Sequence, residues 1–244
     1  MKTTTHSSRY RIRSYEADIH GKASLHTLCS FMQESAWSHA HSMELGFEHM
    51  MEEKQAWVLS RLALKIEKLP EWREELLLTT WARGFHRLFA LRDFIIAGKA
   101  TYIRATSSWL LIDLETRRPK KIEVVQDRMT LHEKESACGK NAEKVGHFPE
   151  LHKQHERPVY YSDLDVNGHL NNVAYIRWII DSLPADFFID HPIRGLTINF
   201  LNEALWTERL EILFDRMPEA GNPLGVSVKR IDDGAEMCRA LLTF

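Results

Sequence analysis

Apolar and polar positions follow the same order twice along the chain. Residues 62–78, LALKIEKLPEWREELLL, align with residues 196–212, LTINFLNEALWTERLEI, at an offset of 134 positions. Both stretches begin with alternating apolar and polar residues, continue through a polar segment and end in an apolar run. This order predicts a strand, a turn and a second strand. The matched pairs are Leu62 with Leu196, Leu64 with Ile198, Ile66 with Phe200, Trp72 with Trp206, Glu74 with Glu208 and Leu76 with Leu210.

A second pair of segments aligns in the same order. Residues 18–35, DIHGKASLHTLCSFMQES, align with residues 165–182, DVNGHLNNVAYIRWIIDS, at an offset of 147 positions. Two aligned blocks that share Asp, Gly and Trp positions make chance similarity a poor explanation, so we predict an internal duplication. The offsets differ by 147 − 134 = 13 residues. The first copy should therefore have the longer connection between helix and next strand, near MELGFEHMMEEKQ.

Each copy predicts one helix followed by antiparallel strands. Helical spacing of apolar positions appears in the first copy at Leu25, Leu28, Cys29 and Met32, and in the second at Tyr175, Ile176, Ile179, Ile180 and Leu183. Residues 93–113 predict two strands around a turn at Ala97–Lys99, and residues 225–244 predict a hairpin at Asp232–Gly234. We expect an α+β protein with two tandem domains, each a curved antiparallel sheet wrapped around a long central helix. The domains should cover 1–125 and 158–244, with a polar surface linker over 126–157.

Composition narrows the class of protein. The chain has 244 residues, of which 44% are hydrophobic and 27% charged, as in soluble globular proteins. A net charge of −2 argues against nucleic acid as a partner. The three cysteines form no metal-spaced pair, which favours a reducing compartment. No apolar run approaches the ~18 residues of a membrane span, and the N-terminal residues show no apolar signal core, so we expect a cytoplasmic protein.

The candidate chemistry is concentrated in residues 160–182, YYSDLDVNGHLNNVAYIRWIIDS. Its polar side chains before the predicted helix are Asp165, Asn167, His169, Asn171 and Asn172. In an extended segment the first three point the same way, and Gly168 permits a tight turn. Asn171 or Asn172 should cap the helix, whose unpaired backbone N–H groups suit an oxygen that gains negative charge in a transition state. Each residue taken alone also has a structural interpretation, as a turn former or a cap.

The duplication provides an internal control for this cluster. The positions matching Asp165, Asn167 and His169 are Asp18, His20 and Lys22, so the architecture forms without the Asn and His. Glu203 is matched by Leu69, which predicts apolar surroundings that would make Glu203 a better proton acceptor near neutral pH. The alternative interpretation is a solvent-facing Glu in a turn. By contrast, Glu208 is matched by Glu74, and we interpret this pair as solvent-facing turn residues.

These stretches carry a family resemblance. The chain resembles acyl-acyl carrier protein thioesterases of the plant-plastid and bacterial type, built from tandem hot-dog domains. The matching stretches are IRSYEAD, FMQESAWSHA, WVLSRLALKIEKLPEWREELLLTTWARG, SSWLLIDLETRRPKKI, SDLDVNGHLNNVAYIRWI and INFLNEA, which cover most of the chain. The resemblance implies hydrolysis of fatty acyl-acyl carrier protein in fatty acid biosynthesis, with no cofactor and no metal. The plastid targeting segment and hydrophobic anchor of plant members are not seen, as expected for a bacterial-type protein.

The resemblance also assigns residues. Family catalytic residues correspond to Asp165, Asn167, His169 and Glu203 in the C-terminal half, while the N-terminal half would hold a degenerate site and shape much of the acyl pocket. Many relatives have Cys directly after the matching Glu, and this chain has Ala204. A nucleophilic mechanism through that position is therefore excluded. We expect attack by water, with Glu203 or a Glu203–His169 pair as base and Asp165 as the rival base.

The implied partner is an acyl carrier protein that presents its acyl chain on phosphopantetheine. Because such carriers are acidic as a family, docking should use a local basic surface. The first candidate is formed by Arg117, Arg118, Lys120 and Lys121, and the second by Arg83, Arg87 and Arg92. Two other functions stay open: an acyl-coenzyme A thioesterase and a non-catalytic acyl-binding module. Acyl chain length is left open, as is the choice between a homodimer and pairing of the two domains within one chain.

Overall fold

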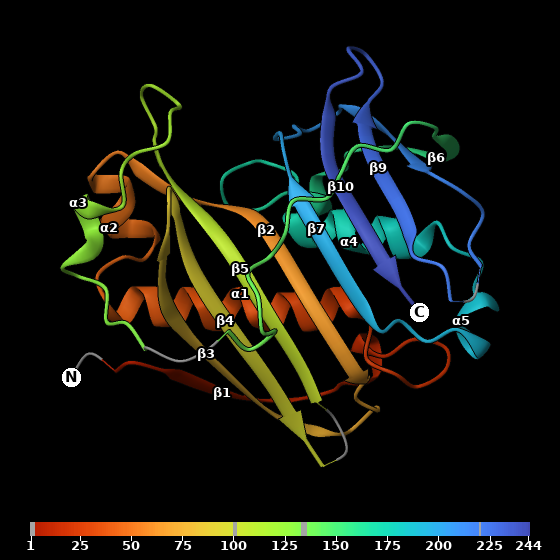
Figure 1. The fold of residues 1–244 in the computed structure, drawn as a ribbon, viewed down its shortest axis with the longest axis horizontal. Coiled ribbons are helices and arrows are strands. Elements are labelled where there is room, and N and C mark those ends of the chain that lie inside the picture. The colour runs from red at the N-terminus through yellow and green to blue at the C-terminus, as the bar shows by residue number, and fades with distance from the viewer. Residues whose placement is uncertain (1–2, 100–101, 133–135, 220) are drawn as a thin grey trace. The chain divides into compact units, whose positions relative to one another are not determined.

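The computed structural model describes residues 3–99, 102–132, 136–219 and 221–244. The chain forms two compact units, Met1–Ala142 and Glu143–Phe244, and each contains an antiparallel sheet with one principal helix (Figure 1). This confirms the α+β class with two similar halves. The boundary between the units lies inside residues 126–157, which were expected to form a linker.

The N-terminal unit is a five-stranded antiparallel sheet in the order β1-β3-β4-β5-β2. Its strands are β1 (His6–Arg11), β2 (Gln55–Lys68), β3 (Glu75–His86), β4 (Phe89–Gly98) and β5 (Tyr102–Asp113). Its helices are η1 (Ser14–Glu16), α1 (Leu25–Ser42), α2 (Phe47–Glu52) and α3 (Glu123–Gln126). The turn expected at Ala97–Lys99 begins where β4 ends, and residues 100–101 lie outside the described residues.

Helix α1 crosses one face of this sheet (Figure 1). Its buried side includes the four apolar positions expected from sequence, Leu25, Leu28, Cys29 and Met32. The buried stripe continues to Ala36 and ends at His39, a polar residue. Helix α2 follows within the segment where the longer connection of the first copy was expected.

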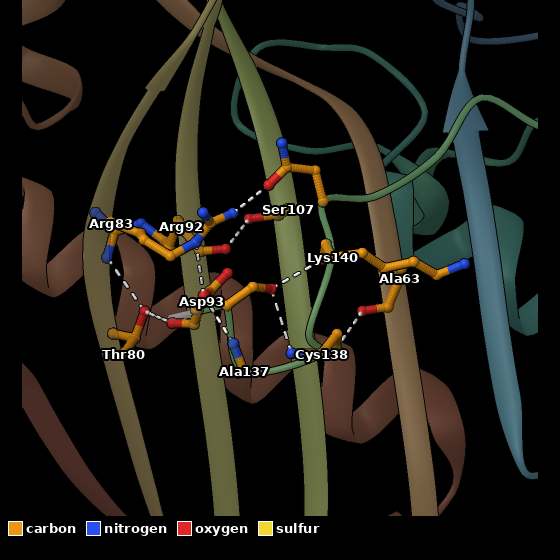
Figure 2. A network of polar contacts seen from close by, with 11 residues as sticks. Ala63, Thr80, Arg83, Arg92, Asp93, Ser107, Ala137, Cys138 and Lys140 are labelled. Atoms are coloured by element: carbon orange, nitrogen blue, oxygen red, sulfur yellow. Dashed lines mark hydrogen bonds and ion pairs between the residues drawn. The ribbon is translucent and has the colours of Figure 1, made fainter. Parts of the chain in front are cut away.

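A buried polar network holds β3 and β4 to their surroundings (Figure 2). The Arg92 guanidinium, whose residue is 8% exposed, donates to His39 Nδ1 at 3.0 Å and to Thr80 Oγ1 at 3.2 Å. Successive strand residues point to opposite faces, so Asp93 faces away from Arg92 and pairs with Arg83 Nε at 2.9 Å. The second docking candidate is therefore wrong as a surface, because two of its three arginines are committed to this network.

Residues 136–142 pack onto the N-terminal unit instead of crossing open solvent. The Ala137 N–H donates to Asp93 Oδ2 at 3.0 Å, and the Cys138 carbonyl accepts from Lys65 Nζ at 2.6 Å. Cys138 and Ala142 are buried. The prediction of a solvated linker over 126–157 is wrong for this stretch, because backbone hydrogen bonds and apolar burial tie it to the sheet. It is also wrong at its end, where residues 152–157 belong to a strand.

The C-terminal unit is a five-stranded antiparallel sheet in the order β7-β10-β9-β8-β6. Its strands are β6 (His152–Pro158), β7 (Gly195–Phe200), β8 (Arg209–Phe214), β9 (Leu224–Arg230) and β10 (Glu236–Thr243). Its helices are η2 (Tyr161–Asp163), α4 (Asn172–Asp181) and α5 (Phe187–Asp190). Helix α4 has 10 residues against 18 in α1, so the central helix of this unit is shorter than expected.

The duplication extends to local backbone geometry. Helices α1 and α4 begin 147 positions apart, as do η1 and η2. Gly21 and Gly168, at the same offset, both have positive φ, +69° and +76°. Arg73 and Thr207, 134 positions apart, both have positive φ, 72° and 70°. The hairpin expected at Asp232–Gly234 is present, with the Gly234 N–H donating to the Arg230 carbonyl at 2.9 Å.

Candidate active site

Asp165 folds the polar loop that precedes α4. Its Oδ1 accepts from the backbone N–H of Asn167 at 2.8 Å and of His169 at 3.2 Å. The Asp165 N–H donates to the His169 carbonyl at 2.8 Å, and Gly168 supplies the positive φ that closes the turn. The carboxylate is therefore held by backbone donors, which is the usual way in which Asp stabilises a tight loop.

The N-terminal unit contains the same turn without the same chemistry. Asp18 Oδ1 accepts from the backbone N–H groups of His20 and Lys22, each at 2.9 Å. The Lys22 side chain then pairs with Glu71 Oε1 at 2.6 Å. Turn formation thus accounts for the Asp in both copies, whereas Asn167, His169 and Glu203 are replaced by His20, Lys22 and Leu69 in the N-terminal copy.

His169 and Glu203 come together from two segments that are distant in sequence. His169 Nε2 lies 3.5 Å from Glu203 Oε2, with side chains 27% and 36% exposed. The two segments are joined by a backbone hydrogen bond of 2.8 Å from the Leu170 N–H to the Ala204 carbonyl, and by a β-bridge between His169 and Leu205. An imidazole and a carboxylate at this separation, open to solvent, can share and move a proton.

The expectation that Glu203 lies in apolar surroundings is wrong. Glu203 is exposed in the turn that follows β7, and the fully buried residue of that turn is Ala204. Ala204 excludes a nucleophile at this position because its methyl side chain has no nucleophilic atom. Glu208 has a structural role, as its counterpart does: Glu208 Oε2 accepts from the Leu205 N–H at 3.1 Å, and Glu74 Oε2 from the Glu71 N–H at 3.0 Å.

The asparagines divide into two roles. Asn171 is the N-cap of α4, and its side chain accepts from the Val173 N–H at 3.0 Å, which confirms the expected cap. Asn167 is exposed at the tip of the loop, and its Nδ2 lies 3.5 Å from Asp165 Oδ2. Its amide is therefore exposed on the same loop that carries His169.

Tyr175 is a further candidate site residue, which the helical spacing of apolar positions had indicated only as a core residue. Its residue is buried on the first turns of α4, its ring centroid lies 6.0 Å from that of Phe200, and Phe200 ends the strand before Glu203. Among the described residues its hydroxyl has no hydrogen-bond partner. Burial raises the pKa of Tyr175 well above its ordinary value. The signal in the sequence is its counterpart Leu28, which shows that the fold does not need a hydroxyl there.

The carrier-docking candidates lie in the N-terminal unit, in the loop after β5. Arg117, Arg118 and Lys121 are exposed, and Lys120 Nζ lies 3.5 Å from Asp113 Oδ2. The loop is anchored by the Asp113 N–H, which donates to the Arg118 carbonyl at 3.0 Å. The hydrogen bond fixes the loop, and its exposed cationic side chains form a surface that could bind an acidic partner.

The histidines of residues 147–155 do not assemble into a site. His152 and His155 are exposed on β6, within the stretch 126–157 that was expected to be a linker. Across the described ranges, no group of three or more His, Cys, Asp or Glu side chains is arranged to hold a metal ion. In the same part of the chain no helix is both long and apolar enough to cross a membrane.

Comparison with known families decides the classification. Residues 3–127 match the acyl-ACP thioesterase N-terminal domain, and residues 146–244 match the acyl-ACP thioesterase C-terminal domain. The chain belongs to the acyl-ACP thioesterase family. Among solved structures, the acyl-ACP thioesterase of Bacteroides thetaiotaomicron is similar with a TM-score of 0.86 and 26% identity, covering 99% of this chain and 98% of that one.

Curated relatives of this acyl-ACP thioesterase family member include plant proteins. A palmitoyl-acyl carrier protein thioesterase of Gossypium hirsutum is 29% identical over 256 residues, covering 96% of this chain and 62% of the relative. Oleoyl-acyl carrier protein thioesterase 2 of Arabidopsis thaliana is 28% identical over 222 residues, covering 82% of this chain and 59% of the relative. The chain thus spans about 60% of the length of these relatives. Both relatives are chloroplast proteins, a finding that overturns the expected cytoplasmic location.

Proposed function

We propose that the protein hydrolyses the thioester of fatty acyl-acyl carrier protein and releases free fatty acid, as a step of fatty acid biosynthesis. The observation that carries this proposal is the His169–Glu203 pair, 3.5 Å apart in the C-terminal unit. The matching positions of the N-terminal unit hold Lys22 and Leu69 on an otherwise equivalent loop and turn. A pair that is present in only one of two copies of the same fold is not required for folding, which indicates that it has a catalytic role.

In the proposed mechanism water attacks the thioester carbonyl carbon. The Glu203–His169 pair accepts the proton of water as the carbon–oxygen bond forms. The Asn167 amide donates to the carbonyl oxygen as that oxygen gains negative charge. When the carbon–sulfur bond breaks, the proton passes from the pair to the leaving thiolate. General-base assistance is worth ~10²–10⁴ in rate and an oxyanion donor about 10²–10³.

The remaining assignments of the proposal rest on the hydrogen bonds of Asp165 and, for the N-terminal unit and the docking loop, on the family resemblance. Asp165 acts by holding the loop, since its carboxylate is engaged by the backbone. The N-terminal unit supplies acyl-binding surface, and the loop that carries Arg117 and Arg118 receives the carrier protein. Association into a homodimer stays a prediction, which sedimentation equilibrium of the purified chain would test.

Replacement of the pair tests the catalytic assignment. We expect Glu203→Gln and His169→Ala each to lower kcat by on the order of 10²-fold, with folding kept, because each removes the proton acceptor. The matched controls are Lys22→Ala and Glu71→Gln, which break the ion pair on the equivalent loop of the N-terminal unit. These controls should leave kcat unchanged. Wild-type kcat in either active-site variant would remove that residue from the chemistry.

Matched substrates test the proposed carrier. Acyl chains of several lengths are presented to the wild-type protein on acyl carrier protein and on coenzyme A, and kcat/KM is measured for each. The proposal expects higher kcat/KM on the carrier protein at every accepted length. A preference for coenzyme A would identify an acyl-coenzyme A thioesterase. Binding of acyl groups without turnover of either substrate would identify an acyl-binding module.

A further inference from the structure

An ion pair between Asp163 and Arg177 links the start of the loop 163–171 to α4. Asp163, the last residue of η2, has a side chain that is only 2% exposed. Its Oδ2 accepts from the Tyr160 N–H at 3.1 Å, and its Oδ1 accepts from Arg177 Nη2. Arg177 lies on α4, and its side chain is 37% exposed. A carboxylate buried to this degree depends on its partners, so removal of the arginine leaves a charge without adequate compensation.

The same residue also closes the loop. The Asn171 N–H donates to the Asp163 carbonyl at 2.9 Å, so Asp163 and Asn171 form the two ends of the loop 163–171. This loop carries all three polar residues of the proposed site that precede the helix, Asp165, Asn167 and His169. Arg177 reaches back from the middle of α4 and fixes the starting end of the loop, while Asn171 fixes the other end by capping the helix.

The N-terminal copy of the loop lacks this anchor. Glu16 replaces Asp163 there, and it makes the same two local contacts: its Oε2 accepts from the Arg13 N–H at 2.8 Å, and its carbonyl accepts from the Ser24 N–H at 2.9 Å. The position of Arg177 is Ser30, whose hydroxyl donates to the His26 carbonyl of its own helix at 3.0 Å. The loop therefore folds without an ion pair to the helix, and the pair is found only beside His169 and Glu203.

We propose that Arg177 is a positioning residue, which holds the loop 163–171 through Asp163 so that His169 stays opposite Glu203. This inference rests on the proposed function for its effect on rate, and on the ion pair alone for its effect on the loop. The two members of the catalytic pair belong to different segments, so their separation of 3.5 Å depends on how the loop is held. A displacement of about 1 Å at such a pair can cost on the order of 10²-fold in rate.

Kinetics of matched variants test the positioning role. Arg177→Gln should lower kcat by about 10- to 100-fold with KM nearly unchanged, since the acyl group still binds and only the pair is misaligned. Arg177→Lys keeps a cation and should recover most of the rate. The control is Asp181→Asn at the end of α4, which removes the 3.2 Å ion pair with Arg157 of β6 and should leave both constants unchanged. An equal loss in Arg177→Gln and Asp181→Asn, or a change confined to KM, would overturn the proposal.

Amide hydrogen exchange tests the anchor without any enzymatic assay. The N–H groups of Asn167, Gly168 and His169 all donate to Asp165, so a displaced loop exchanges them faster. Exchange across residues 163–171 should accelerate in Arg177→Gln and stay as in the wild type in Asp181→Asn. The equivalent loop 16–24 is an internal reference in every sample. Unchanged exchange in Arg177→Gln overturns the proposal, whereas a wild-type chain without thioesterase activity contradicts the proposed function and leaves the exchange result decisive for the anchor.

Discussion

At the scale of single residues, the site separates a carboxylate that builds a turn from one that is open to a substrate. Asp165 Oδ1 accepts two backbone N–H groups, as Asp18 does in the copy without catalytic residues. Glu203 is exposed and faces His169. The local hydrogen bonds therefore favour Glu203, and not Asp165, as the base.

Replacement of Asp165 by its amide decides between these bases. Asp165→Asn keeps an Oδ1 acceptor for the two backbone N–H groups but cannot take a proton at neutral pH. We expect its kcat to fall by less than about 10-fold, well short of the loss expected for Glu203→Gln. The measurement is kcat for both variants and for the matched control Asp18→Asn. A loss in Asp165→Asn as large as in Glu203→Gln would make Asp165 the base.

At the scale of elements, α1 meets its sheet through a polar layer as well as an apolar one. His39 is fully buried, its Nδ1 accepts from Arg92, and its Nε2 lies 3.1 Å from the Thr3 carbonyl. Both contacts are satisfied by a neutral imidazole that donates from Nε2. Burial and the neighbouring Arg92 lower the pKa of His39 from its ordinary 6.5 to about 4.

This lowered pKa predicts a pH-dependent stability. Between pH 6.5 and 4 the unfolded chain binds a proton at His39 that the folded chain does not, so stability is complete above pH 6.5 and falls as the pH decreases. His39 alone should make the free energy of unfolding about 2 kcal/mol lower at pH 5 than at pH 7.5. Urea titrations at both pH values measure it. In His39→Gln the difference between the two pH values should shrink by that amount, and an unchanged difference would mean that His39 does not carry it.

At the scale of the whole molecule, the net charge of −2 gives no general attraction for an acidic carrier. Docking must then use a local surface, and the loop after β5 presents Arg117, Arg118 and Lys121 to solvent. Charges at the rim of an interface act mainly on association and its salt dependence. The catalytic candidates belong to the other unit, so the docking step and the chemical step can be altered separately.

Charge reversal in that loop tests the docking surface. Arg117→Glu with Arg118→Glu should raise KM for acyl carrier protein substrates with little change in kcat, because chemistry is untouched. The defect should shrink as salt rises, since screening acts over ~8 Å at physiological ionic strength. The matched control reverses Arg9 and Arg11, which are exposed on β1 and give the same change in net charge. Equal defects on a small acyl thioester without carrier would contradict docking and indicate damage to the fold or site.

The sequence by itself determined the features that depend on neighbouring residues. The duplication, a helix cap at Asn171 or Asn172, the turn at Gly168 and the hairpin at 232–234 were predicted. Caps and tight turns are formed by hydrogen bonds within a few residues, so the residue types alone indicate them. The family followed from the same motifs, because the loop and its downstream Glu lie at recognisable positions.

Only the tertiary structure decided which side chains are buried and which distant groups meet. Arg92 was expected on a docking surface and lies inside, because α1 supplies His39 as an acceptor from far along the chain. Glu203 was expected in apolar surroundings and is exposed, because the turn buries Ala204 instead. The contact of Arg177 with Asp163 depends on how the loop folds back onto α4. Burial and long-range pairing result from the packing of segments that are remote in sequence. The local pattern of apolar and polar residues does not predict that packing.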